Sequence, residues 1–114
     1  PEAAVLRRII KARQARMRHF DADLFADPAW DILLDLAAAR AERQQVSVTS
    51  LCIAAGVPAT TALRWIGQMV DADLLVRVSD PHDRRRAYIA LSDNTADALA
   101  RYFSEIGVTD LAVV

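Results

Sequence analysis

The stretch that decides the fold is residues 75–92, LVRVSDPHDRRRAYIALS. Two short apolar runs, 75–78 and 88–91, flank a polar loop, 79–87, which is rich in turn-forming residues and carries three consecutive arginines. Short runs rich in valine, isoleucine and tyrosine on both sides of a loop are typical of a β-hairpin. The loop exceeds the usual hairpin length, so we expect a hairpin with a long basic tip.

Two helices joined by a glycine are expected before this hairpin. Ser47 follows an extended residue and is placed to cap a short helix over 47–55, which Gly56 would end in the left-handed conformation. A longer helix is expected over 60–74. A short helix joined through a glycine turn to a longer helix is the helix-turn-helix pattern, and the hairpin extends it to a winged helix. The expected inner faces are Leu51, Cys52 and Ala55 in the short helix and Ala62, Trp65, Ile66 and Met69 in the longer one.

The N-terminal part of the chain indicates two more helices. Apolar residues at helical spacing alternate with bases over 3–20, which predicts an amphipathic basic helix, and an acidic connector follows over 21–27. Asp27 followed by Pro28 marks the start of the next helix, because aspartate caps free N–H groups and proline fits the first helical position. We expect this helix to end near Gln44 and to be largely buried. Its expected inner face is Trp30, Leu33, Leu34, Ala37, Ala38 and Ala41.

One further helix should follow the hairpin, capped by Ser92 and ended by Gly107, with a short apolar tail over 109–114. Its expected inner face is Ala96, Leu99, Phe103 and Ile106. The sequence therefore predicts a mainly α fold with a small β-hairpin, of the α+β class. We divide it into a basic helix with its acidic connector at 1–26, taken as a dimerisation arm, a winged helix-turn-helix domain at 27–106 and a tail at 107–114.

Length and composition exclude several classes of protein. A chain of 114 residues fits one domain, and an apolar content of 54% is too high for intrinsic disorder. A single cysteine, Cys52, cannot form an internal disulfide framework, which favours a reducing, cytoplasmic compartment. No apolar run approaches the roughly 18 residues of a membrane span, and no signal peptide is visible.

The formal net charge of −1 conceals strong segregation along the chain. Residues 1–20 carry +5, residues 21–35 carry −5, residues 36–91 carry +2 and residues 92–114 carry −3. The small total is therefore no argument against a nucleic-acid partner. Thirteen of the fourteen bases are arginines, which make planar bidentate contacts to phosphate and guanine.

Over residues 28–103 the sequence resembles the MarR-type winged helix-turn-helix regulators. The resemblance rests on residues 47–57, 61–66 and 80–92, and the last stretch is the most specific. The wing of the family carries Asp-x-x-Asp-x-Arg and then alternating apolar residues ending in Leu-Thr/Ser, which this chain matches with Asp80, Asp83, Arg85, Leu91 and Ser92. It departs from the family pattern at three positions: Asp73 and Thr95 stand where glycine is usual, and Pro58 where a Ser/Thr cap is usual.

The resemblance implies a homodimer that binds pseudo-palindromic duplex DNA, with the longer helix in the major groove and the wing at the minor groove. Arg64 is the best candidate for a base contact, because a bidentate arginine–guanine pair discriminates by roughly 1–3 kcal/mol. Asp80 or Asp83 can orient an arginine of the wing. The complete set of expected DNA contacts is Ser47, Thr49 and Ser50 at the short helix, Thr60, Thr61, Arg64 and Gln68 on the longer helix, and Arg84, Arg85 and Arg86 in the wing.

Other interpretations remain open at this stage. A winged helix can also serve as a protein–protein interaction module without DNA specificity of its own. An enzyme is not expected, because the sequence has no nucleophile–base pair or phosphate-cradling loop. His19 and His82 lack partners at metal-ligand spacing, so neither a metal nor another cofactor is expected.

The basic N-terminal helix has three possible roles: a homodimer arm with solvated arginines, a phosphate-contacting arm, or a membrane-surface helix. The last is disfavoured because the chain offers no second anchor. Many regulators of the resembled family also bind a small acidic or phenolic effector. Trp30, His19 and Phe20 lie near the junction of the N-terminal helix and could line a crevice for such an aromatic or acidic compound.

Overall fold

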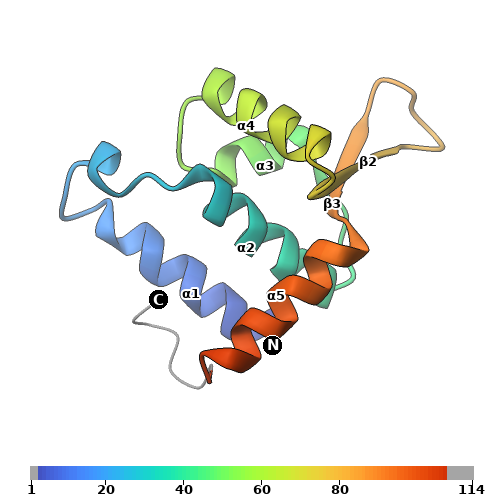
Figure 1. Ribbon diagram of the computed structural model, residues 1–114. Helices are drawn as coiled ribbons and strands as arrows, with labels where there is room; N and C mark the ends of the chain where they lie inside the picture. Colours follow the sequence, from blue (N-terminus) through green and yellow to red (C-terminus); the bar gives the residue numbers. More distant parts are fainter. Residues whose placement is uncertain (1–2, 108–114) are drawn as a thin grey trace.

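The computed structural model describes residues 3–107, which form five α-helices, a short 3-10 helix and three strands (Figure 1). The expected α+β class is confirmed, whereas the tail over 109–114 lies outside the described residues. Within the described part, no helix is long and apolar enough to cross a membrane. The elements in chain order are α1 (Ala3–Arg16), η1 (Ala22–Phe25), α2 (Pro28–Ala41), β1 (Val46–Ser47), α3 (Val48–Ala54), α4 (Ala59–Asp71), β2 (Leu75–Ser79), β3 (Ala87–Leu91) and α5 (Asp93–Glu105).

Helix α2 lies at the centre of the fold. It contacts α1, α3, α4 and β3, and Figure 1 shows it between α1 on one side and the α3–α4 pair on the other. Its start is as predicted: the Asp27 side chain accepts a hydrogen bond from the N–H of Trp30, and Pro28 occupies the first turn. Local sequence signals therefore fix where this central helix begins.

The predicted inner face of α2 was too narrow, although the prediction of a largely buried helix is confirmed. Leu34 and Ala38 are buried as expected, but so are Ile32 and Leu36, while Ala41 is exposed. A single periodic stripe describes a helix that is covered on one side. Because α2 has neighbours on several sides, apolar side chains around most of its circumference enter the core.

The sheet contains one strand more than the predicted hairpin. β2 and β3 pair antiparallel over their full lengths, from Leu75 opposite Leu91 to Ser79 opposite Ala87. β1 adds to the other edge of β3, with Val46 opposite Ile89, so the strand order is β1-β3-β2. A two-residue strand is too short to produce a period-two pattern in the sequence, which explains why its pairing was not predicted. This pairing ties the start of α3 directly to the wing.

Helix α4 ends at Asp71, three residues before the predicted end. Asp73 adopts a left-handed conformation with φ of 61°. The N–H of Leu74 donates to the carbonyl of Met69 and the N–H of Asp73 to the carbonyl of Val70. These two bonds form a Schellman motif, in which the left-handed position favours glycine.

Replacing Asp73 with glycine should therefore stabilise the protein by about 0.5–1 kcal/mol, because glycine adopts positive φ without steric cost. It also removes a carboxylate from the negative end of the helix dipole. Chemical denaturation of Asp73→Gly against wild type measures the gain. As a matched control, Asp71→Gly inside the last helical turn should lower stability by up to about 1 kcal/mol; equal effects of both variants would contradict the assignment.

Helix α1 packs along α2 and contributes Leu6 and Ile9 to the core. It ends at Arg16, earlier than predicted, and the chain then turns through hydrogen bonds from the N–H groups of Met17 to Phe20. The acidic connector contains the short helix η1, which Asp21 caps. Helix α1 is thus part of the same hydrophobic core as α2.

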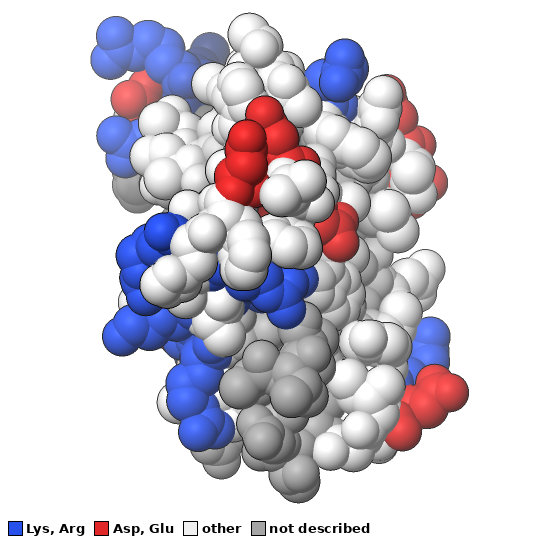
Figure 2. Space-filling model, turned by 90° about the vertical axis from the view of Figure 1, so that its left-hand side faces the viewer, with Lys and Arg blue, Asp and Glu red and all other residues white. Residues whose placement is uncertain are grey.

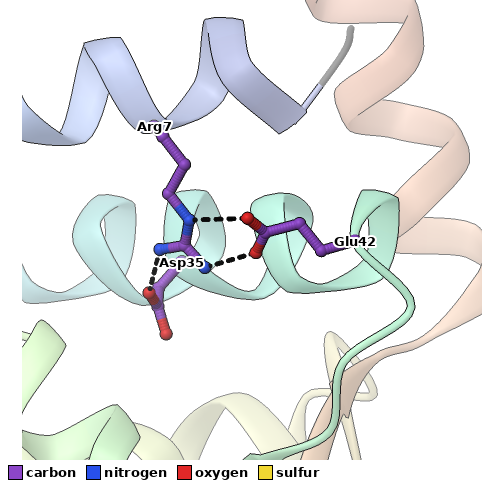
Figure 3. A network of polar contacts seen from close by, with 3 residues as sticks. All are labelled: Arg7, Asp35 and Glu42. Atoms are coloured by element: carbon purple, nitrogen blue, oxygen red, sulfur yellow. Dashed lines mark hydrogen bonds and ion pairs between the residues drawn. The ribbon is translucent and has the colours of Figure 1, made fainter.

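Ion pairs join α1 to α2 and its C-terminal end at two points, and Figure 3 shows the first of them, around Arg7. Arg7 donates from Nη1 to Asp35 Oδ1 at 3.0 Å and from Nη2 to Glu42 Oε1 at 2.7 Å. Further along the helix, Arg13 Nε donates to Asp31 Oδ1 at 2.7 Å. Two aspartates of the acidic segment are therefore paired with N-terminal arginines.

These ion pairs have opposite effects on two carboxyl groups. The hydrogen bond from Arg7 lowers the pKa of Glu42. Asp31 is different: burial raises its pKa, and the opposing contribution of Arg13 does not cancel this effect. Glu42 therefore stabilises the fold when ionised, above the ordinary glutamate pKa near 4.5, and this contribution is lost as the pH falls through its lowered value. Ionisation of Asp31 has the opposite effect on stability, because its pKa is raised in the folded protein.

Glu42→Gln should consequently lower the melting temperature at pH 7, and the difference from wild type should shrink as the pH falls below 4.5 and Glu42 becomes protonated. Thermal unfolding followed by circular dichroism across this range measures it. Glu105→Gln serves as the control, because Glu105 is exposed on α5 and forms no ion pair with any described residue. A constant difference at every pH would show that Arg7 does not act through the Glu42 charge.

Helix α5 covers the remaining side of the core. Ser92 caps it by accepting from the N–H of Thr95, and Gly107 follows its end with φ of 62°, both as predicted. Leu99 and Phe103 are buried, but Ile106, predicted to face inward, is 42% exposed. Ile106 is the C-cap that follows the last helical residue, Glu105, and it is only partly covered.

Candidate nucleic-acid interface

The helix-turn-helix is built from α3 and α4, joined at Gly56. Ser47 caps α3, since its Oγ accepts from the N–H of Ser50 at 3.2 Å. Gly56 has φ of 69°, and a Cβ at this position would lie 3.2 Å from Cε of Met17. Leu51 of α3 and Ile66 of α4 are buried together in the core. These contacts fix the direction in which α4 presents its outer face.

The outward face of α4 carries a polar row at i, i+4 and i+8. Thr60, Arg64 and Gln68 are exposed, and Thr61 beside them is half-buried. At 1.5 Å per residue the row spans about 12 Å. Pro58 occupies the N-cap position of α4, and no side chain caps the start of this helix. The row can therefore contact several adjacent base pairs, which is what a helix in the major groove requires.

The wing tip is organised by its two aspartates. Asp83 Oδ1 accepts from the backbone N–H of Arg85 at 3.0 Å and from its Nε at 3.4 Å. Asp80 has different partners, since it accepts from the N–H of His82 at 2.8 Å and from the hydroxyl of Tyr88 at 3.3 Å. Asp83 thus holds an arginine, whereas Asp80 fixes the base of the loop.

The three consecutive arginines of the wing are all exposed. Arg86 lies near the Tyr88 hydroxyl, which raises the pKa of its guanidinium, with a further contribution from the Asp80 charge. Arg85 is 92% exposed at its side chain although it pairs with Asp83. The wing therefore presents three guanidinium groups at its surface, one of them paired with Asp83.

An open groove runs between the start of α3 and the wing, and we call it the wing groove. It brings together Ser47 and Thr49 of the predicted set with Arg85 and Arg86, whereas Ser50 and Arg84 do not line it. It also includes Arg77, which the sequence analysis missed. The lining residues are Ser47, Val48, Thr49, Arg77, Asp83, Arg85, Arg86 and Ala87.

The residues suggested for an effector crevice do not meet in one cavity. Trp30 packs edge-on against Tyr102, with ring centroids 5.5 Å apart, and Phe20 packs edge-on against Phe25 at the same distance. A cavity at the junction of α1, α2 and α3, which we call the junction cavity, involves neither Trp30, Phe20 nor His19. Its walls include Ile10, Arg13, Arg16, Met17, Phe25, Asp31 and Ile53.

Charge is segregated on the surface as well as along the chain. Figure 2 shows basic side chains gathered along one edge of the face it displays, with a separate acidic group near the middle.

Among the described residues, no three His, Cys, Asp or Glu side chains form a group that could hold a metal ion. Cys52 is buried with a free thiol.

No protein-family model matches the chain, and no curated protein matches it significantly. Solved structures do match. The transcriptional regulator PA4135 gives a TM-score of 0.61 at 17% identity, over 85% of this chain and 71% of the regulator. S. aureus MepR in its DNA-binding conformation gives 0.58 at 18% identity, over 92% of this chain and 75% of MepR. A probable transcriptional regulator from Pseudomonas aeruginosa gives 0.58 at 24% identity, over 89% and 78%.

The chain therefore has the winged helix-turn-helix fold of transcriptional regulators. More narrowly, its fold is that of the MarR-type regulators, so the resemblance found in residues 47–57, 61–66 and 80–92 is confirmed at the level of the fold.

Proposed function

We propose that this protein is a sequence-specific, duplex-DNA-binding transcriptional regulator that acts as a homodimer. In this proposal α4 enters the major groove and the wing, residues 79–87, reaches the neighbouring minor groove. The observation that carries it is the exposed row of Thr60, Arg64 and Gln68 on α4, on the same domain as a wing with three exposed arginines. A helix that reads bases and a basic loop that enters a narrow groove need this combination.

The two parts of the interface have different tasks. Arg64 reads sequence, because its fork of N–H groups matches the O6 and N7 acceptors of guanine. Arg84 and Arg86 interact with the negative potential of the minor groove and contribute to binding at any sequence. Asp83 holds Arg85 through its backbone and its side chain, which limits the geometries that this arginine can adopt.

We place the dimer contact on α1, which lies across α2 from α4 (Figure 1). Arg7 and Arg13 are already bound to acidic residues of α2, which supports a structural role for this helix over a phosphate-contacting one. Two copies related by a two-fold axis would present two α4 helices to successive turns of a pseudo-palindromic duplex.

Selection of bound duplexes from a random pool at two salt concentrations, with sizing of the complex, tests this function. We expect an enriched pseudo-palindrome, two protein chains per duplex, and an affinity that falls steeply with salt. Recovery of no enriched sequence, or binding that is independent of salt, would overturn the proposal. A stoichiometric protein partner that wing variants release would instead support the interaction-module alternative.

Single substitutions separate base readout from general attraction. Arg64→Ala should cost about 1–3 kcal/mol on the selected duplex and leave scrambled duplexes nearly unaffected. Arg84→Ala combined with Arg86→Ala should weaken binding to both duplexes and reduce the slope of log affinity against log salt by about 0.9 per lost phosphate contact. Arg101→Ala, at an exposed position of α5, is the matched control. Identical losses on both duplexes for Arg64→Ala would exclude it from base readout.

We also place the effector, a small aromatic or acidic compound, in the junction cavity. Its walls combine the apolar side chains of Ile10, Met17 and Phe25 with the guanidinium of Arg13. A carboxylate entering the cavity would compete with Asp31 for the guanidinium of Arg13. Burial already raises the pKa of Asp31.

Aromatic carboxylates such as benzoate should therefore raise the melting temperature, and the rise should increase with ligand concentration. A thermal-shift titration measures this, with Phe25→Ala expected to abolish the shift and benzyl alcohol serving as an uncharged control. Equal shifts with benzoate for wild type and Phe25→Ala, or no shift for wild type, would remove the effector from this cavity.

A further inference from the structure

Arg77 is the one guanidinium of the wing groove that comes from a strand and not from the wing loop. Its partner across the β2–β3 ladder is Ile89, which is buried, and Ile89 pairs on its other side with Val46 of β1. The backbone of Arg77 is thus held at the middle of β2, an edge strand that pairs with β3 along its whole length. Arg85 and Arg86 belong to the loop between β2 and β3.

The charge of the wing groove is unbalanced. Three guanidiniums, those of Arg77, Arg85 and Arg86, line it against a single carboxylate, that of Asp83. That carboxylate is engaged by Arg85. Arg77 is exposed and forms no ion pair with any residue that the structure describes. The groove therefore holds an exposed positive charge, carried on a strand, that no ion pair among the described residues engages.

Hydroxyl groups complete this surface. Ser47 and Thr49 line the same groove from the side of α3. Ser47 Oγ is already hydrogen-bonded to Ser50 as the helix cap, whereas Thr49 is exposed. A guanidinium with a hydroxyl group across an open groove suits one phosphate of a phosphodiester chain, which accepts charge-assisted and neutral hydrogen bonds together.

We propose that the wing groove is a phosphate-binding subsite for the DNA backbone, with Arg77 as its anchor and Thr49 as a second donor. The inference rests on the proposed function and deepens it. Because the contact is to phosphate, Arg77 carries no sequence information. It fixes the register of the duplex between α4 and the wing. Its place in β2 means that its backbone is positioned by the strand pairing and not by the wing loop.

The test measures binding to the selected duplex and to a scrambled duplex of equal length over a range of salt. Arg77→Ala should weaken both about tenfold, as expected for loss of a hydrogen bond to a charged group, and lower the salt slope by about 0.9. Arg77→Lys should keep the slope but only part of the affinity, because lysine retains the charge and loses the fork. Thr49→Val should cost a few-fold in affinity with no change of slope.

Two controls make the outcomes distinguishable. Arg101→Ala lies outside the wing groove and should change neither quantity, and thermal unfolding should show that every variant folds. Phosphate ethylation interference should lose one contact per half-site in Arg77→Ala and keep the others. If wild type binds duplexes but Arg77→Ala has an unchanged slope and interference pattern, the subsite is overturned while the regulator function stands. If wild type binds no duplex, both proposals fail.

Discussion

The burial of α2 is the constraint on which the other elements depend. A helix with apolar side chains around most of its circumference cannot stand at a surface, so it requires cover on several sides. The structure supplies α1 on one flank, α3 and α4 on another, and β3 beside it. Ile32 and Leu34 are fully buried as a result. The helix-turn-helix is therefore mounted on the same core that holds the N-terminal helix.

The arginine content of the chain divides into structural and available charge. Arg7 and Arg13 neutralise Asp35, Glu42 and Asp31 along the α1–α2 contact. Exposed pairs of this kind contribute little to stability, whereas pairs that are mostly buried are costly to break. Arg13 and Asp31 are each only 12% exposed at their side chains, so this pair is the stronger constraint.

Features encoded by adjacent residues could be predicted from the sequence. The caps at Asp27, Ser47 and Ser92 and the left-handed Gly56 are short-range signals, and all four lie where predicted. Features that depend on tertiary neighbours could not. β1 has two residues and no periodicity of its own, and the exposure of Ile106 depends on how far α5 extends beyond the core.

The same distinction applies to the candidate site. The row on α4 follows from helical spacing alone, so Thr60, Arg64 and Gln68 could be recognised together. Arg77 could not, because its relation to Ser47 depends on two successive strand pairings that place segments thirty residues apart along one groove. The sequence of a strand does not show which other segments will lie beside its side chains in the folded sheet.

The two-residue strand β1 has a mechanical consequence. It runs without a linker into α3 at one end of the helix-turn-helix and is hydrogen-bonded to β3 of the wing. The helix-turn-helix and the hairpin are consequently held at a fixed spacing from each other. In the proposed DNA complex, a duplex that contacts both the helix-turn-helix and the hairpin must itself bend or change its groove width to fit, so duplexes that deform at low energetic cost are favoured before any base is read.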